Sequence, residues 1–260
     1  MSNQAIPAAL RALGFRATDA QIEALLAHCM KSKLGALQAI EQLVEIEKRE
    51  RERRNLATRE RSSLLGTVPG LDQFDWSFPR QIDRTLYERL LRLEFIKTGG
   101  NVLFRGASGV GKTTLAQALG SAALVAGHTV RFSTLADAIA DLAKAESIPA
   151  LERGLKRYTK PSLLIIDEIG YLPCEIQGGN WLYTIISRRH EKRSTVLSTN
   201  LSYKEWSEVF HGAACVAALV DRFAQHCDTM HIEGDSWRNH QRALKDAKLK
   251  EAKIKKRTSA

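Results

Sequence analysis

The sequence predicts an α/β fold in which helices flank a parallel sheet, with a small all-α domain before it. Three features indicate this: apolar and helical segments alternate from residue 101 onward, a glycine-rich loop joins the first such pair, and the beginning of the chain shows only helical periodicity. A chain of 260 residues can hold one such domain and one small companion. We expect a helical domain at 1–64, a linker at 65–80, the α/β domain at 81–240 and a basic tail at 241–260.

The first domain is predicted to consist of helices that bury one face each. Thr18 and Gln21 fit a capping box, and apolar residues then recur every three to four positions in the segments 22–29 and 34–46. Residues 47–61 are almost wholly charged, with seven Lys or Arg and four Glu. Such a segment is usually an exposed helix with many ion pairs and less often a nucleic-acid surface.

The linker carries three aromatic residues close together. Phe74, Trp76 and Phe78 have period two, which predicts an extended segment that presses one face onto the next domain. Direct stacking on a nucleic-acid base is the alternative. A helix at 82–97 is expected to follow and to end before Gly99.

The α/β domain contains four predicted strands with three predicted helices. The strands lie at 101–105, 129–133, 162–167 and 194–199, and the helices at 113–126, 135–145 and 181–193. The alternating order implies right-handed crossovers between parallel strands. The strand at 162–167 is apolar on both faces, as expected for the centre of such a sheet.

The first strand of this domain is followed by a phosphate-binding loop. The loop matches G-x-x-x-x-G-K-[ST] in full and consists of Gly106, Ala107, Ser108, Gly109, Val110, Gly111, Lys112 and Thr113. In this pattern, backbone N–H groups and the helix N-terminus surround the phosphates of a nucleotide. Lys112 is expected to bind the β- and γ-phosphates of ATP, the Thr113 hydroxyl to coordinate Mg²⁺, and Thr114 to complete the nucleotide contacts.

Two carboxylates lie where the strand at 162–167 ends. Asp167 is expected to hold Mg²⁺ through its hydration shell, and Glu168 is a candidate general base for a water molecule. A small-molecule kinase needs no such base, because its acceptor substrate is the nucleophile. The pair therefore favours ATP hydrolysis coupled to mechanical work over phosphate transfer to a metabolite.

Two further polar side chains are candidates for the reaction. Asn200 follows the strand at 194–199, where its amide can bond the attacking water or the γ-phosphate; capping of the next turn is the alternative. Arg222 lies on a predicted helix and has the guanidinium that an arginine finger uses to contact the γ-phosphate of a neighbouring subunit. A surface ion pair with Asp221 is the alternative for this arginine.

Charge and cysteine usage indicate the partners and the compartment. The net charge is +10, and residues 238–257 carry nine Lys or Arg against two acids. Such a segment attracts a polyanion, usually DNA or RNA, although a solvated tail is the alternative. The four cysteines are scattered and are expected to be reduced. Neither a membrane span nor a secretion signal is recognisable, which predicts a cytoplasmic protein.

Several motifs together resemble the IstB family of AAA+ ATPases, which assist the transposases of bacterial insertion sequences and are similar to DnaC-type helicase loaders. The motifs are the phosphate-binding loop, Leu-Leu-Ile-Ile-Asp-Glu-Ile-Gly-Tyr-Leu-Pro at 163–173, and the segments 187–190, 198–200, 221–223 and 234–238. The resemblance covers roughly residues 65–240. It is weaker over the helical domain, which in this family is thought to engage DNA or the transposase.

The resemblance implies roles for the side chains around the loop. Lys112 and Thr113 would bind ATP and Mg²⁺. Asp167 and Glu168 would form the Walker B pair, and Asn200 would act as the first sensor. The implied reaction is ATP hydrolysis.

It also implies roles for arginines later in the chain. Arg222 would reach the ATP of the next subunit. Arg238 would contact phosphate within its own subunit, although the family often has Tyr where this chain has Trp237. For Arg188 and Arg189, the subunit interface and DNA remain open alternatives. The long lid helices of many AAA+ proteins are expected to be absent, with only a charged tail after Arg238.

The function implied by the resemblance is an ATP-driven assembly cycle. ATP binding would favour a homo-oligomer that holds double-stranded DNA with little sequence preference, bends it and activates the transposase. The nearest alternative is a DnaC-type loader of a replicative helicase. A binding protein that uses ATP as a clamp without turnover is a third alternative, and no membrane association is expected.

Overall fold

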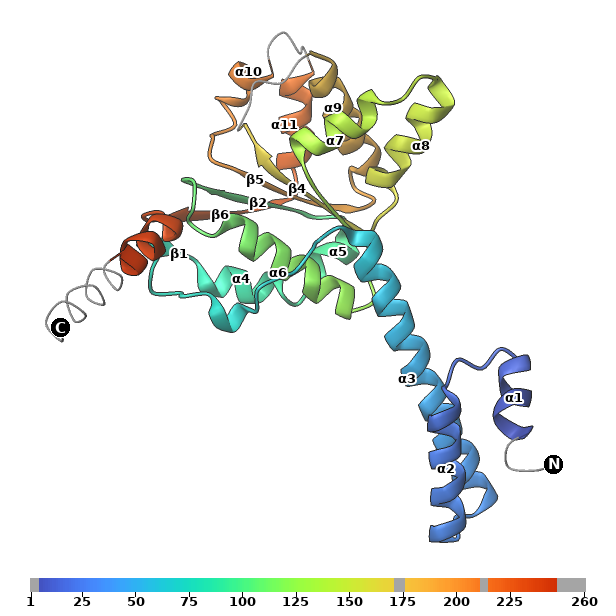
Figure 1. The fold of residues 1–260 in the computed structure, drawn as a ribbon. Coiled ribbons are helices and arrows are strands. Elements are labelled where there is room, and N and C mark those ends of the chain that lie inside the picture. Colours follow the sequence, from blue (N-terminus) through green and yellow to red (C-terminus); the bar gives the residue numbers. More distant parts are fainter. Residues whose placement is uncertain (1–4, 171–175, 211–214, 247–260) are drawn as a thin grey trace, which may run out of the picture. The chain divides into compact units, whose positions relative to one another are not determined.

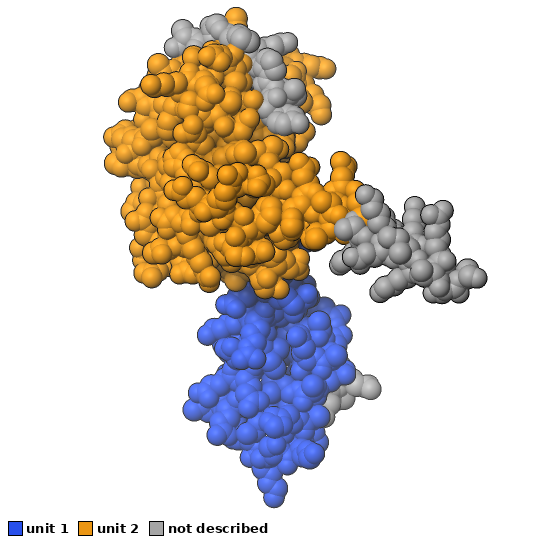
Figure 2. Space-filling model, turned by 90° about the vertical axis from the view of Figure 1, so that its left-hand side faces the viewer, with its two compact units in different colours: residues 1–61 blue, residues 62–260 orange. Residues whose placement is uncertain are grey.

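The computed structural model describes residues 5–170, 176–210 and 215–246. The chain separates into two compact units, residues 1–61 and 62–260 (Figure 2). Residues 171–173 of the family motif and the last part of the basic tail lie outside the described residues. Within the described part of the chain, no helix is both long and apolar enough to cross a membrane.

The first unit is built from three helices: α1 (Ala5–Ala12), α2 (Asp19–Ser32) and α3 (Ala36–Ser63) (Figure 1). The predicted capping box begins α2: the Gln21 N–H donates to Thr18 Oγ1 at 3.3 Å, and Gln21 Oε1 accepts from the Thr18 N–H at 2.8 Å. This satisfies N–H groups that have no partner inside the helix. α2 buries Ile22 and Leu25, as its apolar spacing predicts.

The predicted buried face of α3 is wrong along the first half of the helix. Leu37, Ile40 and Val44 are 70%, 58% and 44% exposed, whereas Glu47 and Glu50 are buried. α1 and α2 have 8 and 14 residues and cannot cover every apolar position on a helix of 28 residues. The charged segment forms the predicted ion pairs, which join Glu45 to Arg49, Glu47 to Arg51, and Glu50 to both Arg53 and Arg54.

In its described residues, the second unit contains a six-stranded sheet in the order β1-β6-β2-β5-β4-β3. The strands are β1 (Gln81–Ile82), β2 (Asn101–Gly106), β3 (Val130–Thr134), β4 (Leu163–Ile169), β5 (Ser194–Thr199) and β6 (Cys227–Glu233). All neighbouring strands are parallel except β1 and β6. The predicted α/β class with a parallel sheet is confirmed, and the four predicted strands are β2 to β5.

The sequence analysis missed β6 and the short edge strand β1. Met230 and Ile232 of β6 are buried, but His231 and Glu233 between and after them are exposed. This strand therefore has no apolar run of the kind that marks β4. Its residues 227–232 nevertheless pair with the whole of β2, the strand that leads into the phosphate-binding loop.

Helices cover both faces of this sheet (Figure 1). One face carries α4 (Arg84–Leu90), α5 (Glu94–Thr98) and α6 (Lys112–Val125). The other carries α7 (Leu135–Ala143), α8 (Ile148–Thr159), α9 (Ile176–Arg189), α10 (Trp206–Val209) and α11 (Val216–Ala224). A core of buried side chains, among them Ile166, Trp206 and Phe223, joins this second group to the sheet.

The structure corrects the helix predictions at four places. The segment 82–97 forms α4 and α5 rather than one helix, because Leu93 adopts a left-handed backbone with φ 60° between them. α9 begins at Ile176, five residues earlier than predicted, and α8 is absent from the sequence-based prediction. Residues 237–246 are helical, where only a charged tail is predicted after Arg238.

The linker aromatics pack within the second unit, which is the first of the two alternatives considered for them. The rings of Phe74 and Trp76 are 4.8 Å apart, and those of Trp76 and Tyr87 are 5.4 Å apart. The Tyr87 hydroxyl in turn donates to the Leu115 carbonyl of α6 at 3.0 Å. This chain of contacts fixes the linker beside the helix that follows the phosphate-binding loop.

Candidate nucleotide-binding site

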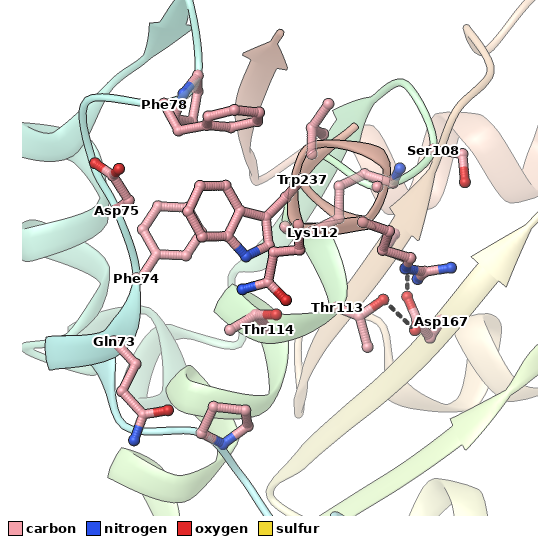
Figure 3. A pocket seen from close by; sticks show the side chains of 18 of the residues that line it. Gln73, Phe74, Asp75, Phe78, Ser108, Lys112, Thr113, Thr114, Asp167 and Trp237 are labelled. Atoms are coloured by element: carbon pink, nitrogen blue, oxygen red, sulfur yellow. Dashed lines mark hydrogen bonds between the residues drawn. The ribbon is translucent and has the colours of Figure 1, made fainter. Parts of the chain in front are cut away.

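A pocket of about 420 Å³ lies where β2, β4 and β5 reach their carboxyl ends (Figure 3). Of the residues predicted for the site, the pocket is lined by Ser108, Gly109, Val110, Gly111, Lys112, Thr113, Thr114, Asp167, Glu168, Asn200 and Arg238. Gly106 and Ala107 belong to the same loop but do not line the pocket, and Arg222 lies elsewhere. Ligands of parallel α/β sheets bind at this edge.

Glycine is required in the loop because other residues would collide with their surroundings. A Cβ on Gly111, which has φ 99°, would lie 2.6 Å from Phe74 Cε2. A Cβ on Gly106 would lie 2.2 Å from the carbonyl oxygen of Ile232 on β6. The loop is therefore held between the linker on one side and β6 on the other.

The Lys112 ammonium lies against the loop itself. Its Nζ donates to the carbonyl oxygens of Gly106 at 2.8 Å and Ala107 at 2.7 Å. Burial lowers the pKa of Lys112, an effect that the negative charge of Asp167 opposes. A partly desolvated cation at the N-terminus of α6 is a strong attractor for phosphate.

Thr113 and Asp167 bring the loop and β4 together. Thr113 Oγ1 donates to Asp167 Oδ2 at 2.7 Å, and the hydroxyl of Ser198 on β5 donates to Asp167 Oδ1. Asp167 is 3% exposed. A hydroxyl and a carboxylate are the oxygen ligands that Mg²⁺ prefers, so the residues present fit that ion.

Glu168 is presented to the pocket by a distortion of β4. The register between β4 and β5 shifts between Ile166 and Ile169, and Glu168 has φ 62°. The Ser198 hydroxyl accepts the Glu168 N–H at 3.1 Å, and the Glu168 side chain is exposed. Bulges re-aim side chains beside active sites, and a positive φ at a residue other than glycine carries an energetic cost.

Asn200 lies directly after β5, is exposed and lines the pocket. The preceding Thr199 anchors this strand end, because its hydroxyl donates to the Ile169 carbonyl of β4 at 2.7 Å. Ser198 thus contacts the acid pair, and Asn200 follows two residues later. The sequence analysis missed Ser198, because β5 reads Ser-Thr-Val-Leu-Ser-Thr and one more hydroxyl residue in it gives no distinct signal.

The remaining wall of the pocket is aromatic and was not predicted as part of the site. It comprises Phe74, Phe78 and Trp237, with Gln73 and Asp75 beside them (Figure 3). The rings of Phe78 and Trp237 meet edge to face at 4.7 Å, and the backbone N–H of Trp237 donates to the Gly109 carbonyl at 3.0 Å. The signal in the sequence is the aromatic cluster upstream of the loop.

Arg238 follows Trp237 and lines the same pocket. Its positive charge is one cause of the lowered pKa of Lys112, after burial. The repulsion between two cations in one pocket is relieved when a polyanion binds between them. Arg238 and Lys112 therefore lie within one subunit's site.

Arg222 lies on α11, away from the pocket of its own chain. Its Nη1 donates to the Ser187 hydroxyl of α9, and its guanidinium carbon lies 5.1 Å from the centre of the Tyr183 ring. The ion pair with Asp221 considered from the sequence is not among the ion pairs of the described residues.

The two arginines that end α9 differ in their surroundings. Arg188 is exposed and forms a two-nitrogen pair with Glu152 at 2.7 and 2.8 Å. Arg189 is 1% exposed, and burial lowers its pKa to about 9. Its nitrogens donate to the Thr195 hydroxyl and to backbone carbonyls of residues 158, 159, 161, 162 and 194. Arg189 is thus a core side chain, and neither alternative considered for it applies.

The parallel sheet, the glycine-rich loop after β2 and the acidic end of β4 define a P-loop NTPase of the AAA+ class. More narrowly, the chain belongs to the family described as IstB-like ATP binding protein, which matches residues 8–245. The predicted family is confirmed.

Curated relatives and solved structures agree with this assignment. The chain is 36% identical over 217 residues to the insertion sequence IS21 putative ATP-binding protein of Pseudomonas aeruginosa, covering 84% of this chain and 82% of the relative. It is 33% identical over 209 residues to the insertion sequence IS5376 putative ATP-binding protein of Geobacillus stearothermophilus, covering 80% and 83%. The fold is similar to that of the DnaC helicase loader, with a TM-score of 0.50 and 19% identity over 63% of this chain and 96% of that one.

Proposed function

We propose that this protein is a Mg²⁺-dependent ATPase that assists the transposase of an insertion sequence. The observation that carries the proposal is the meeting of Thr113, Asp167 and Glu168 in one pocket with Lys112. Two of its curated relatives are named as ATP-binding proteins of insertion sequences. The geometry supports the ATPase, and the relatives support the process that it serves.

The chain's own residues supply the chemistry of hydrolysis. Lys112 and the backbone N–H groups of the loop bind the β- and γ-phosphates. Thr113 and Asp167 would hold Mg²⁺, which neutralises phosphate charge when bound. Glu168 accepts a proton from water as the water oxygen bonds to the γ-phosphorus; the bond to the β,γ-bridging oxygen breaks, giving ADP and inorganic phosphate. Asn200 orients that water.

The aromatic wall binds the base of the nucleotide in this proposal. Phe74, Phe78 and Trp237 offer apolar surface, and Gln73 offers an amide that can bond a purine edge. Arg238, on the same helix as Trp237, contacts a phosphate from the same subunit. The linker and the helix at 237–246 thereby sense whether the site is filled.

Assembly links this site to DNA. Arg222 of one subunit contacts the γ-phosphate in the next, so ATP favours a homo-oligomer. The net charge of +10 favours double-stranded DNA, which the oligomer holds through phosphates with little sequence preference and bends for the transposase. The first unit serves as the surface for DNA or the protein partner.

Two measurements test the proposal. The first is phosphate release from ATP with and without duplex DNA, and the absence of turnover would leave only an ATP clamp. The second is a parallel pull-down against an insertion-sequence transposase and against the replicative helicase of the same host. Capture of the helicase alone would replace transposition with helicase loading, while the ATPase assignment would stand.

A further inference from the structure

The first unit contains a second pocket, of about 370 Å³, whose lining carries three arginines. It is lined by Arg16, Arg51, Arg54, Asn55 and Thr58. Arg16 belongs to the segment between α1 and α2, and the other four residues belong to α3. Among the described residues, no carboxylate lines this pocket. Its lining therefore offers hydrogen-bond donors and positive charge to a ligand.

The α3 residues of this pocket share one face of the helix. Arg51, Arg54, Asn55 and Thr58 stand at positions i, i+3, i+4 and i+7, which superpose along a helix. Over these positions the helix rises by about 10 Å. The periodicity gathers two guanidinium groups, an amide and a hydroxyl into one stripe, and Arg16 adds a third guanidinium from another segment.

Two buried carboxylates hold the arginines of this stripe in place. Glu47 Oε2 accepts the backbone N–H groups of Arg16 at 2.7 Å and Ala17 at 2.9 Å, and Glu47 Oε1 accepts the Nε–H of Arg51 at 2.5 Å. Glu50 Oε1 accepts Arg54 Nε at 2.6 Å. The Glu47 and Glu50 side chains are 9% and 2% exposed, whereas Arg51 and Arg54 are 57% and 46% exposed.

This arrangement resembles a prepared anion site rather than a set of surface ion pairs. Arg51 and Arg54 use Nε for the buried acids, and Arg51 Nη2 also donates to the Gly14 carbonyl at 3.4 Å. These bonds fix each guanidinium and leave its other terminal nitrogens for a ligand. Arg16 pairs with no carboxylate among the described residues, so its charge is uncompensated. Fixed donors lose less entropy on binding than free ones.

We propose that this pocket binds a backbone phosphate of nucleic acid. Convergent guanidinium groups suit the several oxygens of a phosphate, and the neutral donors Asn55 and Thr58 are typical of contacts to sugar and phosphate. Because a phosphate contact carries no sequence information, it positions the helix without sequence preference. The inference rests on the proposed binding of DNA and locates one contact of it on α3.

The test compares duplex binding by full-length variants over a range of salt concentrations. Arg16→Gln with Arg54→Gln removes two positive charges from the pocket, and Glu50 keeps its pair with Arg53. The matched control, Lys48→Gln with Arg49→Gln, removes two charges from exposed positions of α3 outside the pocket. The pocket variant is expected to bind about tenfold more weakly and to lower the slope of log K against log salt by about one, on unrelated duplex sequences alike.

Equal effects of the two double variants would overturn the proposal, because the charge alone would then explain the loss. If the wild-type protein binds no duplex, the proposed DNA function fails instead, so the two failures are distinguishable. If the double variant is too unstable to compare, the single variant Arg16→Gln, which removes no ion pair of the described residues, is compared with Arg49→Gln. Calorimetry with inorganic phosphate tests whether the ligand is free phosphate instead. If the pocket variant loses phosphate binding but keeps its duplex affinity, the pocket is a site for free phosphate and the proposal is refuted.

Discussion

The hydroxyl of Thr113 donates a 2.7 Å hydrogen bond to the carboxylate of Asp167, which is 54 residues away in the sequence. The bond joins the start of α6 to the end of β4, the two elements that meet at the phosphate-binding edge of the sheet. Both atoms are ligands of the kind that Mg²⁺ takes, so a shared cation can replace the shared proton.

Asp167→Asn is expected to remove the effect of Mg²⁺ on ATP affinity, because the amide has no charge to hold the ion. Calorimetric titration with ATP, with and without Mg²⁺, measures this effect. Wild-type protein should gain at least tenfold in affinity from Mg²⁺, equivalent to about 1.4 kcal/mol, and the variant almost none. Thr113→Ser keeps a hydroxyl and serves as the control. A normal Mg²⁺ response in Asp167→Asn would remove Asp167 from the site.

Glu168→Gln is expected to bind ATP normally and to hydrolyse it roughly 10²-fold to 10⁴-fold more slowly, because the amide accepts no proton from water. Gln has the same length as Glu and is compatible with the same hydrogen bond from its N–H to Ser198. Single-turnover phosphate release measures the chemical step. The ATP-bound variant should also remain on DNA longer than the wild type. Hydrolysis at the normal rate would show that another group activates the water.

Arg222→Ala is expected to lower hydrolysis by about 10³-fold to 10⁵-fold while leaving ATP affinity unchanged, because the finger acts on the neighbouring site. Mixing provides a sharper test. Subunits with Arg222→Ala keep Glu168, and subunits with Glu168→Gln keep the finger, so mixed oligomers should regain part of the activity that both variants lack. Without recovery on mixing, a role across the interface is refuted. Arg188→Ala, which removes an exposed arginine from the neighbouring α9, is the control.

The sequence revealed those parts of the site that form short, contiguous patterns. The loop at 106–113 and the two acids of β4 could be found because glycine spacing and a buried apolar run leave local signals. Ser198 and Trp237 could not, because their contacts with Asp167 and Gly109 come from pairing β5 with β4 and from the path of the chain after β6.

The same dependence on local patterns explains the errors in the predicted fold. β6 was missed because its exposed polar residues break the apolar pattern, although β2 pairs with it along its length. Arg189 looked like a surface residue, since an arginine next to another arginine is usually exposed. Its burial depends on carbonyl groups at the end of α8, in the segment between α8 and β4, and at the start of β5, which no local pattern indicates.

Arg189→Ala is expected to lower the free energy of unfolding by more than about 3 kcal/mol, because several buried carbonyl oxygens would lose their donor. Arg188→Ala removes a partly exposed ion pair with Glu152 and should cost less than about 1 kcal/mol. Chemical denaturation followed by tryptophan fluorescence reports on this unit, since all four tryptophans lie within residues 62–260. Similar losses for the two variants would contradict the assignment of Arg189 to the core.

Acid should loosen α3 through Glu50. Hydrogen bonds from Arg53 and Arg54 lower the pKa of Glu50 from its usual value near 4.5 to about 2. The folded state therefore favours the ionised carboxylate: this contribution to stability is complete above about pH 4.5 and is lost as the pH falls through 2.

Hydrogen exchange of peptides from residues 36–63 in the full chain, measured between pH 5 and 2 and corrected for intrinsic rates, should show protection falling in the wild type. Glu50→Gln should have lower protection at pH 5 and a flatter dependence below it, whereas Glu45→Gln, whose carboxylate forms an exposed pair with Arg49, should follow the wild type. An unchanged pH dependence in Glu50→Gln would mean that the acid response of α3 arises from another group.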